Sequence, residues 1–157
     1  MAYRVAIVDD IGADAEFVKG ILTDWAYDRQ IGVQTEIFPS AERFLFRYAE
    51  DKNWDILLLD IEMGAMDGVT MAKRVRRDNE AVQIVFITGY SDYIAEGYEV
   101  AALHYLMKPV SREKLMTVLV RALDKRKQQE RCLILESTGE LVRLPFYEIR
   151  YQEGREF

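Results

Sequence analysis

The amino-acid sequence predicts an α/β fold in which a parallel sheet is covered by helices on both faces. Two observations lead to this prediction. Short apolar runs rich in Val, Ile and Leu alternate along the chain with longer stretches whose apolar residues recur at helical spacing. The runs 5–8, 56–59 and 84–87 are apolar throughout, and strands of that kind have to be buried on both faces. Buried strands that alternate with helices form a parallel sheet with helices packed on either side.

Five strands are expected, and each is followed by a stretch with helical periodicity. The strands are residues 4–8, 33–38, 56–59, 84–87 and 104–107. Because crossovers between parallel strands are right-handed, few topologies remain, and the flavodoxin-like order 2-1-3-4-5 is a common one for a chain of this length. We therefore predict a flavodoxin-like (βα)5 doubly wound sheet with that strand order.

Stripes of apolar residues predict the helices. The stripes are Phe17, Val18, Ile21, Leu22 and Trp25; Ala41, Phe44, Leu45 and Tyr48; Val69, Ala72 and Val75; and Leu115, Val118, Leu119 and Ala122. A less regular helix is expected over residues 92–99. Ser40 and Ser111 precede the second and the last of these helices and are expected to cap them. Phe46 is also expected in the core.

The composition is that of a globular domain. A chain of 157 residues, of which 50% are hydrophobic and 31% charged, is long and apolar enough for one packed domain. No apolar run approaches the roughly 20 residues of a membrane span and the start lacks signal-peptide features, so we expect a cytoplasmic protein with no membrane partner. The single cysteine, Cys132, excludes an internal disulfide. The net charge of −6 disfavours binding of this segment to DNA phosphates.

Polar side chains follow the strands where the strands end. Asp9 and Asp10 follow the first strand, Asp60 the third, Thr88 the fourth and Lys108 the fifth. Because the carboxyl ends of parallel strands meet at one edge, these side chains are expected to converge. Carboxylates at ~4 Å repel by about 4 kcal/mol per pair in an effective dielectric of about 20, so positive charge is needed among them. A divalent cation such as Mg²⁺, with Lys108, meets that need and suits phosphoryl transfer to Asp60.

Each of these residues taken singly has a plainer explanation. Asp9 and Asp10 can start a loop and cap a helix, and Asp60 can be a solvated loop residue. Thr88 can be a strand-end hydroxyl, and Lys108 a surface charge. Only their joint occurrence at the carboxyl ends of strands favours the functional interpretation.

The same residues resemble the receiver domain of two-component response regulators, which is CheY-like. The resemblance rests, in the right order over residues 3–126, on Val8-Asp9-Asp10, Asp60, Met66-Asp67-Gly68, Thr88-Gly89 and Lys108-Pro109. It implies a phosphoacceptor signalling domain and not a metabolic enzyme. Such a domain accepts a phosphoryl group from a histidine kinase and catalyses only its own phosphorylation and dephosphorylation. The acceptor would be Asp60.

The resemblance also implies how Mg²⁺ is held. Asp10 and Asp60 would bind the ion directly, Asp9 would bind it through a water, and Glu62 would contribute its backbone carbonyl. The acidic side chain of Glu62 departs from the small or polar residues most familiar at that position. We expect this acid to alter the lifetime of the phosphoryl group.

A switch is implied as well. Thr88 would hydrogen-bond a phosphoryl oxygen and Lys108 would pair with another, and the Lys108-Pro109 bond is expected to be cis. Tyr105 matches the aromatic residue that turns inward when the threonine moves. The expected output is a rearranged surface made by the fourth helix, the fifth strand and the fifth helix, with a homodimer on activation.

Residues 127–157 are predicted to be an appendage. The basic stretch 125–131 is expected to end the last helix and begin a linker, and residues 133–135 and 141–144 are expected to form two strands. Residues 145–153 resemble the opening strands of a LytTR-type DNA-binding domain. We therefore expect a receiver at 1–126, and at 127–157 a linker followed by the first strands of an incomplete LytTR-type DNA-binding domain. Transcription would be regulated through the missing part, which would contact DNA.

Two other functions fit parts of the pattern. Asp60-Ile61-Glu62 bears a faint likeness to metal-dependent phosphohydrolases, but these need a second aspartate where Glu62 stands. A flavin-binding flavodoxin needs backbone and hydroxyl donors after the first strand, where Asp9 and Asp10 would repel a phosphate. His104, the single histidine, can be imagined as a phosphate carrier, but it is more simply a strand residue.

Overall fold

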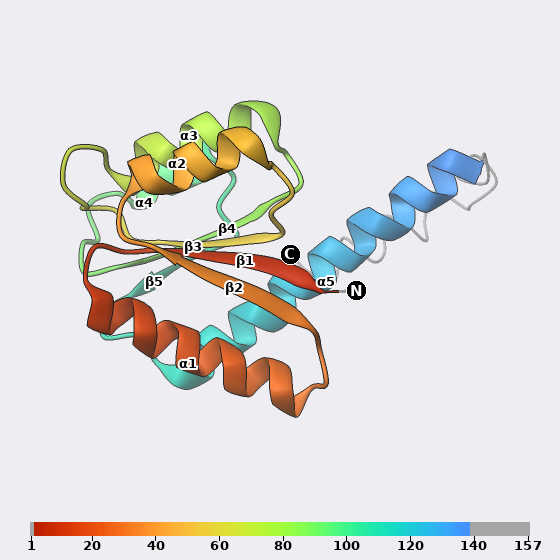
Figure 1. Cartoon of the computed structure of the whole chain (residues 1–157), viewed down its shortest axis with the longest axis horizontal. Coiled ribbons are helices and arrows are strands. Elements are labelled where there is room, and N and C mark those ends of the chain that lie inside the picture. Colours follow the sequence, from red (N-terminus) through yellow and green to blue (C-terminus); the bar gives the residue numbers. More distant parts are fainter. Residues whose placement is uncertain (1, 139–157) are drawn as a thin grey trace.

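Residues 2–138 are described in the computed structural model of the chain, and within them five strands alternate with five helices (Figure 1). In chain order these elements are β1 (Tyr3–Val8), α1 (Gly12–Asp28), β2 (Val33–Phe38), α2 (Ala41–Glu50), β3 (Ile56–Leu59), α3 (Gly68–Asp78), β4 (Gln83–Thr88), α4 (Ile94–Glu99), β5 (His104–Met107) and α5 (Arg112–Thr138). All five predicted strands are present. The fourth helix begins two residues later than expected.

The strands form one parallel sheet in the order β2-β1-β3-β4-β5, so the predicted flavodoxin-like topology is confirmed. Figure 1 shows α2, α3 and α4 on one face of the sheet and α1 and α5 on the other. The side chains of β3 alternate between the two apolar cores. Leu57 and Leu59 pack under α2 and α3, whereas Leu58 packs against α1 and α5. A continuous apolar strand is therefore used on both faces.

Side-chain caps begin three of the helices. Ser40 accepts a hydrogen bond from the backbone N–H of Arg43 at 3.1 Å, and Ser111 accepts one from that of Lys114 at 3.3 Å, as predicted. Asp67, which the sequence did not predict as a cap, begins α3, where it accepts from the Thr70 N–H at 2.7 Å.

Helix α1 begins without such a cap. Its N-cap residue is Ile11, which makes no side-chain hydrogen bond to the helix. The plainer explanation of Asp9 and Asp10 as a helix cap is therefore not supported.

Two aromatic residues expected in the core are exposed. Phe17 is 55% and Phe46 is 75% exposed, whereas Phe44 is fully buried. The reason is helical geometry, because each residue turns the helix by about 100°. Phe46 comes two residues after Phe44 and so lies on the opposite side of α2. The face of α1 that packs on the sheet is formed by Val18 and the other buried residues of this helix. Phe17 lies outside that face.

The prediction that the last helix gives way to a linker and a strand is wrong for residues 127–138. Helix α5 continues to Thr138, and Figure 1 shows it extending well beyond the sheet. The segment is rich in Lys, Arg, Gln, Glu and Leu, which are strong helix formers, and it contains no Gly or Pro. A three-residue apolar run does not override that preference. The predicted strand 141–144 and the segment 145–153 lie outside the described residues.

An ion pair joins α5 to the residue that precedes β3. Arg126 donates to Oδ1 of Asp55 through Nε at 3.0 Å and through Nη2 at 2.8 Å. The other oxygen of Asp55 accepts from the backbone N–H of Arg4 at 2.8 Å. Farther along the helix, Leu133 and Ile134 are 64% and 61% exposed.

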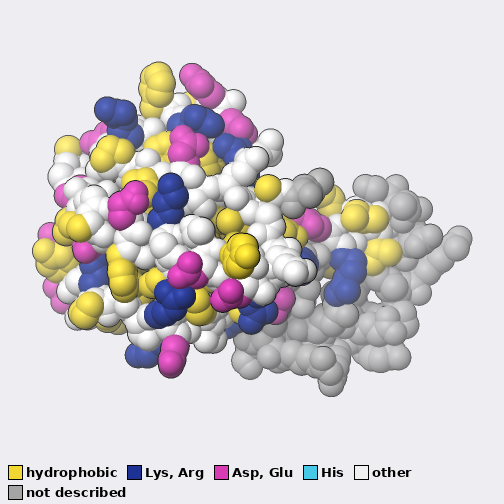
Figure 2. All heavy atoms as spheres, turned by 60° about the horizontal axis from the view of Figure 1, so that its bottom comes forward, with side chains coloured by type: hydrophobic (Ala, Val, Ile, Leu, Met, Phe, Trp, Pro, Cys, Tyr) yellow, Lys and Arg dark blue, Asp and Glu magenta, His cyan; other side chains and the backbone are white. Residues whose placement is uncertain are grey.

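The surface is mixed in character. On the face that α1 and α5 form, Figure 2 shows acidic and basic side chains interspersed rather than gathered into a basic patch. That view gives no continuous positive surface of the kind that DNA phosphates favour. Over residues 2–138, every helix is too short or too polar to cross a bilayer.

The two phenylalanines of α2 allow a matched test of the packing. We expect Phe44→Ala to lower the free energy of unfolding by about 3–5 kcal/mol, because it leaves a cavity among packed aromatic rings. We expect Phe46→Ala on the same helix to change it by less than about 0.5 kcal/mol. Urea unfolding followed by circular dichroism measures both values, and equal losses would contradict the assignment of the two faces.

Candidate functional site

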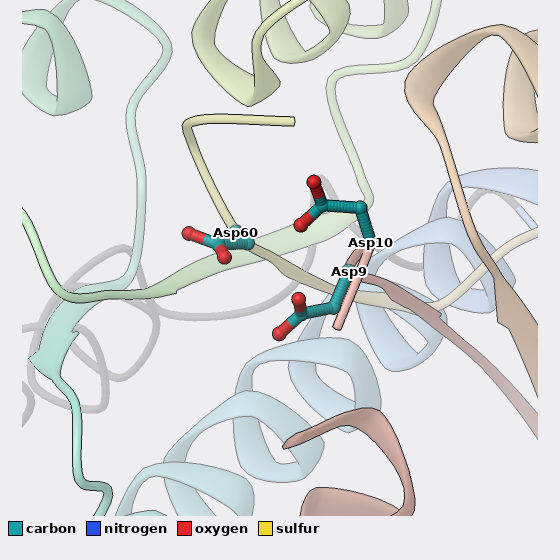
Figure 3. Close-up of side chains that lie close together, drawn as sticks. All are labelled: Asp9, Asp10 and Asp60. Atoms are coloured by element: carbon teal, nitrogen blue, oxygen red, sulfur yellow. The ribbon is translucent and has the colours of Figure 1, made fainter. Parts of the chain in front are cut away.

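Three aspartates meet at the carboxyl edge of the sheet. Asp9 and Asp10 follow β1 and Asp60 follows β3, and one carboxylate oxygen of each lies within 4.8 Å of the others. Figure 3 shows the three carboxylates directed into one shared space. Asp9 is 6% and Asp60 is 5% exposed, whereas Asp10 is open to solvent. The convergence that the sequence predicted for these residues is therefore observed.

Backbone hydrogen bonds of the sheet fix where the two buried aspartates lie at the ends of their strands. The N–H of Asp9 donates to the carbonyl of Phe38 at 3.1 Å, and the N–H of Asp60 donates to that of Val8 at 2.9 Å. Both residues thus continue the parallel pairing by one more hydrogen bond before the chain turns away. Neighbouring strands therefore end at the same level.

Each buried carboxylate has one oxygen held by its own loop. Oδ1 of Asp9 accepts from the N–H of Ile11 at 2.9 Å, and Oδ1 of Asp60 accepts from the N–H of Ile61 at 2.7 Å. The second oxygen of each, Oδ2, accepts from the Lys108 ammonium at 2.8 Å and 2.9 Å. The orientation of both side chains is thereby fixed.

Lys108 reaches the cluster from the end of β5. Its side chain is only 17% exposed, and the Lys108-Pro109 peptide bond is cis, as predicted. A third carboxylate, Asp14 on the first turn of α1, accepts from the same Nζ at 2.8 Å. Sequence reasoning missed Asp14. The available signal was an acid one helical turn after Asp10, at the start of the helix nearest the site.

For both Asp9 and Lys108, burial shifts the pKa in one direction and the contacts between opposite charges shift it in the other. Burial raises the pKa of Asp9, and the hydrogen bonds from Lys108 and the Ile11 N–H only partly offset it. Burial lowers the pKa of Lys108, but its bonds to Asp14, Asp9 and Asp60 outweigh that effect and the net pKa is raised. The ammonium therefore stays charged across the physiological range.

Thr88 ends β4 next to this cluster in the sheet order. The residue is fully buried, and among the described residues its Oγ1 finds no hydrogen-bond partner. A buried hydroxyl without a partner costs about 1–3 kcal/mol, so its presence calls for an explanation. The carbonyl of Thr88 accepts from the Lys108 N–H at 2.8 Å, which joins the two strand ends.

Tyr105 and Glu62 lie around the same edge. The hydroxyl of Tyr105 donates to the backbone carbonyl of Tyr90, and its ring packs 5.9 Å from that of Phe86. The side chain of Glu62 is exposed and accepts from the hydroxyl of Tyr93 at 3.4 Å. The proposed role of the Glu62 backbone carbonyl stays a prediction.

His104 begins β5 with its side chain exposed, and Lys108, not His104, reaches the aspartates. Partial burial of the imidazole, followed by the charges of Arg121 and Lys114, lowers the pKa of His104. The plainer interpretation of His104 as a strand residue agrees with this position.

Gly68 lets the loop after β3 close over Asp60. A Cβ at this position would lie 2.0 Å from the carbonyl oxygen of Asp60, so only glycine fits. The Gly68 N–H donates to the carbonyl of Ile61 at 2.7 Å. Here the sequence motif contained the right residue, but the close backbone approach that requires it is visible only in three dimensions.

The donor set fits a hard divalent cation. The cluster offers carboxylate oxygens only, from one exposed and two buried aspartates, and Mg²⁺ prefers one or two carboxylates together with waters and phosphate oxygens. Lys108 neutralises only part of the negative charge of Asp9, Asp10, Asp14 and Asp60. A site with these groups can accept a phosphoryl group if further positive charge joins it.

The fold and this edge define an α/β domain with an acidic site beyond the carboxyl ends of its strands. Comparison with known families makes the assignment more specific. The profile of the response regulator receiver domain matches residues 5–120. The chain therefore belongs to the response regulator receiver family.

Individual relatives agree with this assignment. The transcriptional regulatory protein NatR of Bacillus subtilis is 27% identical over 123 residues, which are 78% of this chain and 51% of NatR. The sensory transduction protein LytT of the same organism is 29% identical over 116 residues, 74% of this chain and 46% of LytT. The chain thus spans about half the length of these curated relatives.

A solved structure shows the same fold. The CheY-like receiver domain from Methanospirillum hungatei superposes with a TM-score of 0.72 at 24% identity, covering 82% of this chain and 99% of that one.

Two glycines test how closely the loop after β3 packs on the backbone of Asp60. We expect Gly68→Ala to destabilise the domain by about 3 kcal/mol, because the added methyl group meets backbone and not a flexible side chain. Gly20→Ala is the control, since its Cβ meets nothing within 4 Å in the middle of α1. That change should stabilise by about 0.5–1 kcal/mol. Thermal unfolding compares the two, and an unaffected Gly68→Ala protein would refute the close approach.

Proposed function

We propose that this chain is the phosphoacceptor part of a two-component transcriptional regulator and that Asp60 accepts a phosphoryl group from a histidine kinase. The observation that most supports this proposal is the position of the Asp60 carboxylate. It is 95% buried, yet it lies beside two further aspartates and 2.9 Å from a charged ammonium. An ordinary structural carboxylate gains nothing from two acidic neighbours. A nucleophile does gain from them, because acidic neighbours help to hold the cation that must accompany an incoming anionic group.

The transfer needs only one covalent exchange. A carboxylate oxygen of Asp60 attacks phosphorus and forms the new O–P bond while the P–N bond to the histidine of the kinase breaks. The electron pair of the broken bond returns to the imidazole. The protein contributes position and charge, which is the usual division of labour in phosphoryl transfer. Beyond this, the domain would catalyse only its own dephosphorylation.

The residues that would hold Mg²⁺ are Asp10 and Asp60 directly, Asp9 through a water, and Glu62 through its backbone carbonyl. When bound, the ion supplies positive charge to the phosphoryl oxygens. The closeness of one carboxylate oxygen of each of Asp9, Asp10 and Asp60, all within 4.8 Å of one another, supports a shared ion.

Lys108 and Thr88 would receive the phosphoryl oxygens. Lys108 already donates to Asp60, so a group on that carboxylate comes within its reach. The unpartnered hydroxyl of Thr88 gains a hydrogen bond when a phosphoryl oxygen arrives, and this gain supports its role as the switch residue. The Tyr105 hydroxyl holds the loop that follows Thr88, at the carbonyl of Tyr90. Movement of the threonine would therefore act on Tyr105.

The output would leave through the surface of α4, β5 and α5. This surface carries exposed apolar side chains, with Ile94 at 47%, Tyr98 at 84% and Met107 at 43% exposed. Such groups favour contact with a second copy of the domain once the surface rearranges. We propose a homodimer in the phosphorylated state.

The output domain would be of the LytTR type. The likeness to LytT and the resemblance of residues 145–153 to opening strands of that domain support this part of the proposal. Residues 1–126 would form the receiver and residues 127–157 would lead into the output, the first part of the connection being the helical continuation of α5. DNA would be contacted by residues beyond this segment.

Incubation with acetyl phosphate and Mg²⁺ tests the acceptor. Intact-mass measurement should show a gain of one phosphoryl group on the native protein and none on Asp60→Ala. Asp24→Ala, which removes an exposed aspartate of α1, is the matched control and should gain the group like the native protein. A gain on Asp60→Ala, or none on the native protein, would count against the proposed acceptor.

Two equally exposed tyrosines test the dimer surface. With Mg²⁺ and beryllofluoride, sedimentation of the native protein should shift from monomer to dimer. Tyr98→Ala should weaken the dimer by about tenfold in dissociation constant, since buried tyrosines dominate interfaces. Tyr27→Ala on α1, where the tyrosine is 83% exposed, should leave it unchanged. Equal effects of the two substitutions would place the interface elsewhere.

A further inference from the structure

We infer that Asp14 is a positioning residue that competes with the phosphoryl group for Lys108. The inference rests on the proposed function and adds to it a residue that sets how readily the site accepts the group. It starts from the number of donors on the lysine. An ammonium has three N–H donors and no acceptor. In this structure the three carboxylates of Asp9, Asp14 and Asp60 lie 2.8, 2.8 and 2.9 Å from Nζ, so all three donors are used.

A phosphoryl oxygen can pair with Lys108 only if one of these contacts breaks. The three contacts differ in how easily they break. The side chains of Asp9 and Asp60 are 6% and 5% exposed, and each is also held by a backbone N–H. The side chain of Asp14 is 41% exposed, so water can replace the ammonium there.

The contact between Lys108 and Asp14 is therefore the one that breaks when a phosphoryl oxygen pairs with the lysine. Asp60 is the residue that carries the group, so the comparison is between the other two partners. Breaking the contact to buried Asp9 leaves a charge without a partner, which costs several times more than returning the half-exposed carboxylate of Asp14 to water. The resting site thus holds its lysine with one replaceable partner. Asp14 keeps the ammonium in place before the reaction and opposes its transfer to the phosphoryl group.

Removal of Asp14 is expected to favour the phosphorylated geometry. The probe is beryllofluoride with Mg²⁺, a phosphoryl mimic that binds without a chemical step, and fluorine NMR measures its affinity. We expect Asp14→Ala to raise the affinity about fivefold, the size of one partly exposed ion pair. Asp14→Glu retains a carboxylate and should stay within about twofold of the native protein. Asp24→Ala removes a like charge from the far part of the same helix and should also leave the affinity unchanged.

A double-mutant cycle separates this competition from simple repulsion. If Asp14 acts through Lys108, then Asp14→Ala has no effect on affinity in a Lys108→Gln background. If its charge merely repels the anion, the gain persists there. A gain in that background, or no gain in the native background, overturns the inference.

An ionic-strength series gives an independent reading that needs no Lys108 variant. At about 1 M salt the Debye length is about 3 Å, so long-range repulsion is screened, whereas competition for a direct contact is not. The gain from Asp14→Ala should therefore survive at high salt, and its disappearance contradicts the inference. Failure of the proposed function looks different, because then the native protein neither binds beryllofluoride nor gains a phosphoryl group on Asp60.

Discussion

The hydrogen bonds between one ammonium and three carboxylates hold the functional edge of this domain together. Lys108 comes from the end of β5, Asp9 and Asp60 from the ends of β1 and β3, and Asp14 from α1, so the interaction joins residues up to 99 positions apart. Without the lysine, two buried aspartates would have no positive neighbour among the described residues in contact with them. The lysine makes the acidic cluster tolerable in the fold, and the cluster keeps net negative charge because one ammonium cannot neutralise all of its carboxylates.

The sheet makes that interaction possible. Parallel pairing in the order β2-β1-β3-β4-β5 brings every strand end to one edge, and two layers of helices exclude water from the strands but not from that edge. Gly68 then allows the loop after β3 to fold back on the Asp60 backbone. The unpartnered hydroxyl of Thr88 and the bond from Tyr105 to the Tyr90 carbonyl lie on the neighbouring strands β4 and β5. If Asp60 accepts a phosphoryl group as proposed, these two strands would connect it to the surface of α4, β5 and α5.

The strands, their order and the convergence of Asp9, Asp10, Asp60 and Lys108 could be predicted because they follow from local patterns and from one rule about parallel sheets. The exposure of Phe17 and Phe46 could not, since an apolar residue beside a stripe has no local mark of which way it faces. Asp14 was missed because its role depends on where the Lys108 side chain ends. The continuation of α5 to Thr138 could not be read from the apolar run 133–135, because such a run suits a strand or a helix and the helix propensity of its neighbours decides between them.

The most direct test of the account is chemical identification of the residue that carries the phosphoryl group. An acyl phosphate on aspartate is reduced by borohydride to homoserine, which peptide mass spectrometry locates to a single residue. After treatment with acetyl phosphate and Mg²⁺, the account predicts homoserine at position 60 and at no other aspartate. Homoserine at Asp9 or Asp10, or a phosphoryl group found on His104, would contradict it.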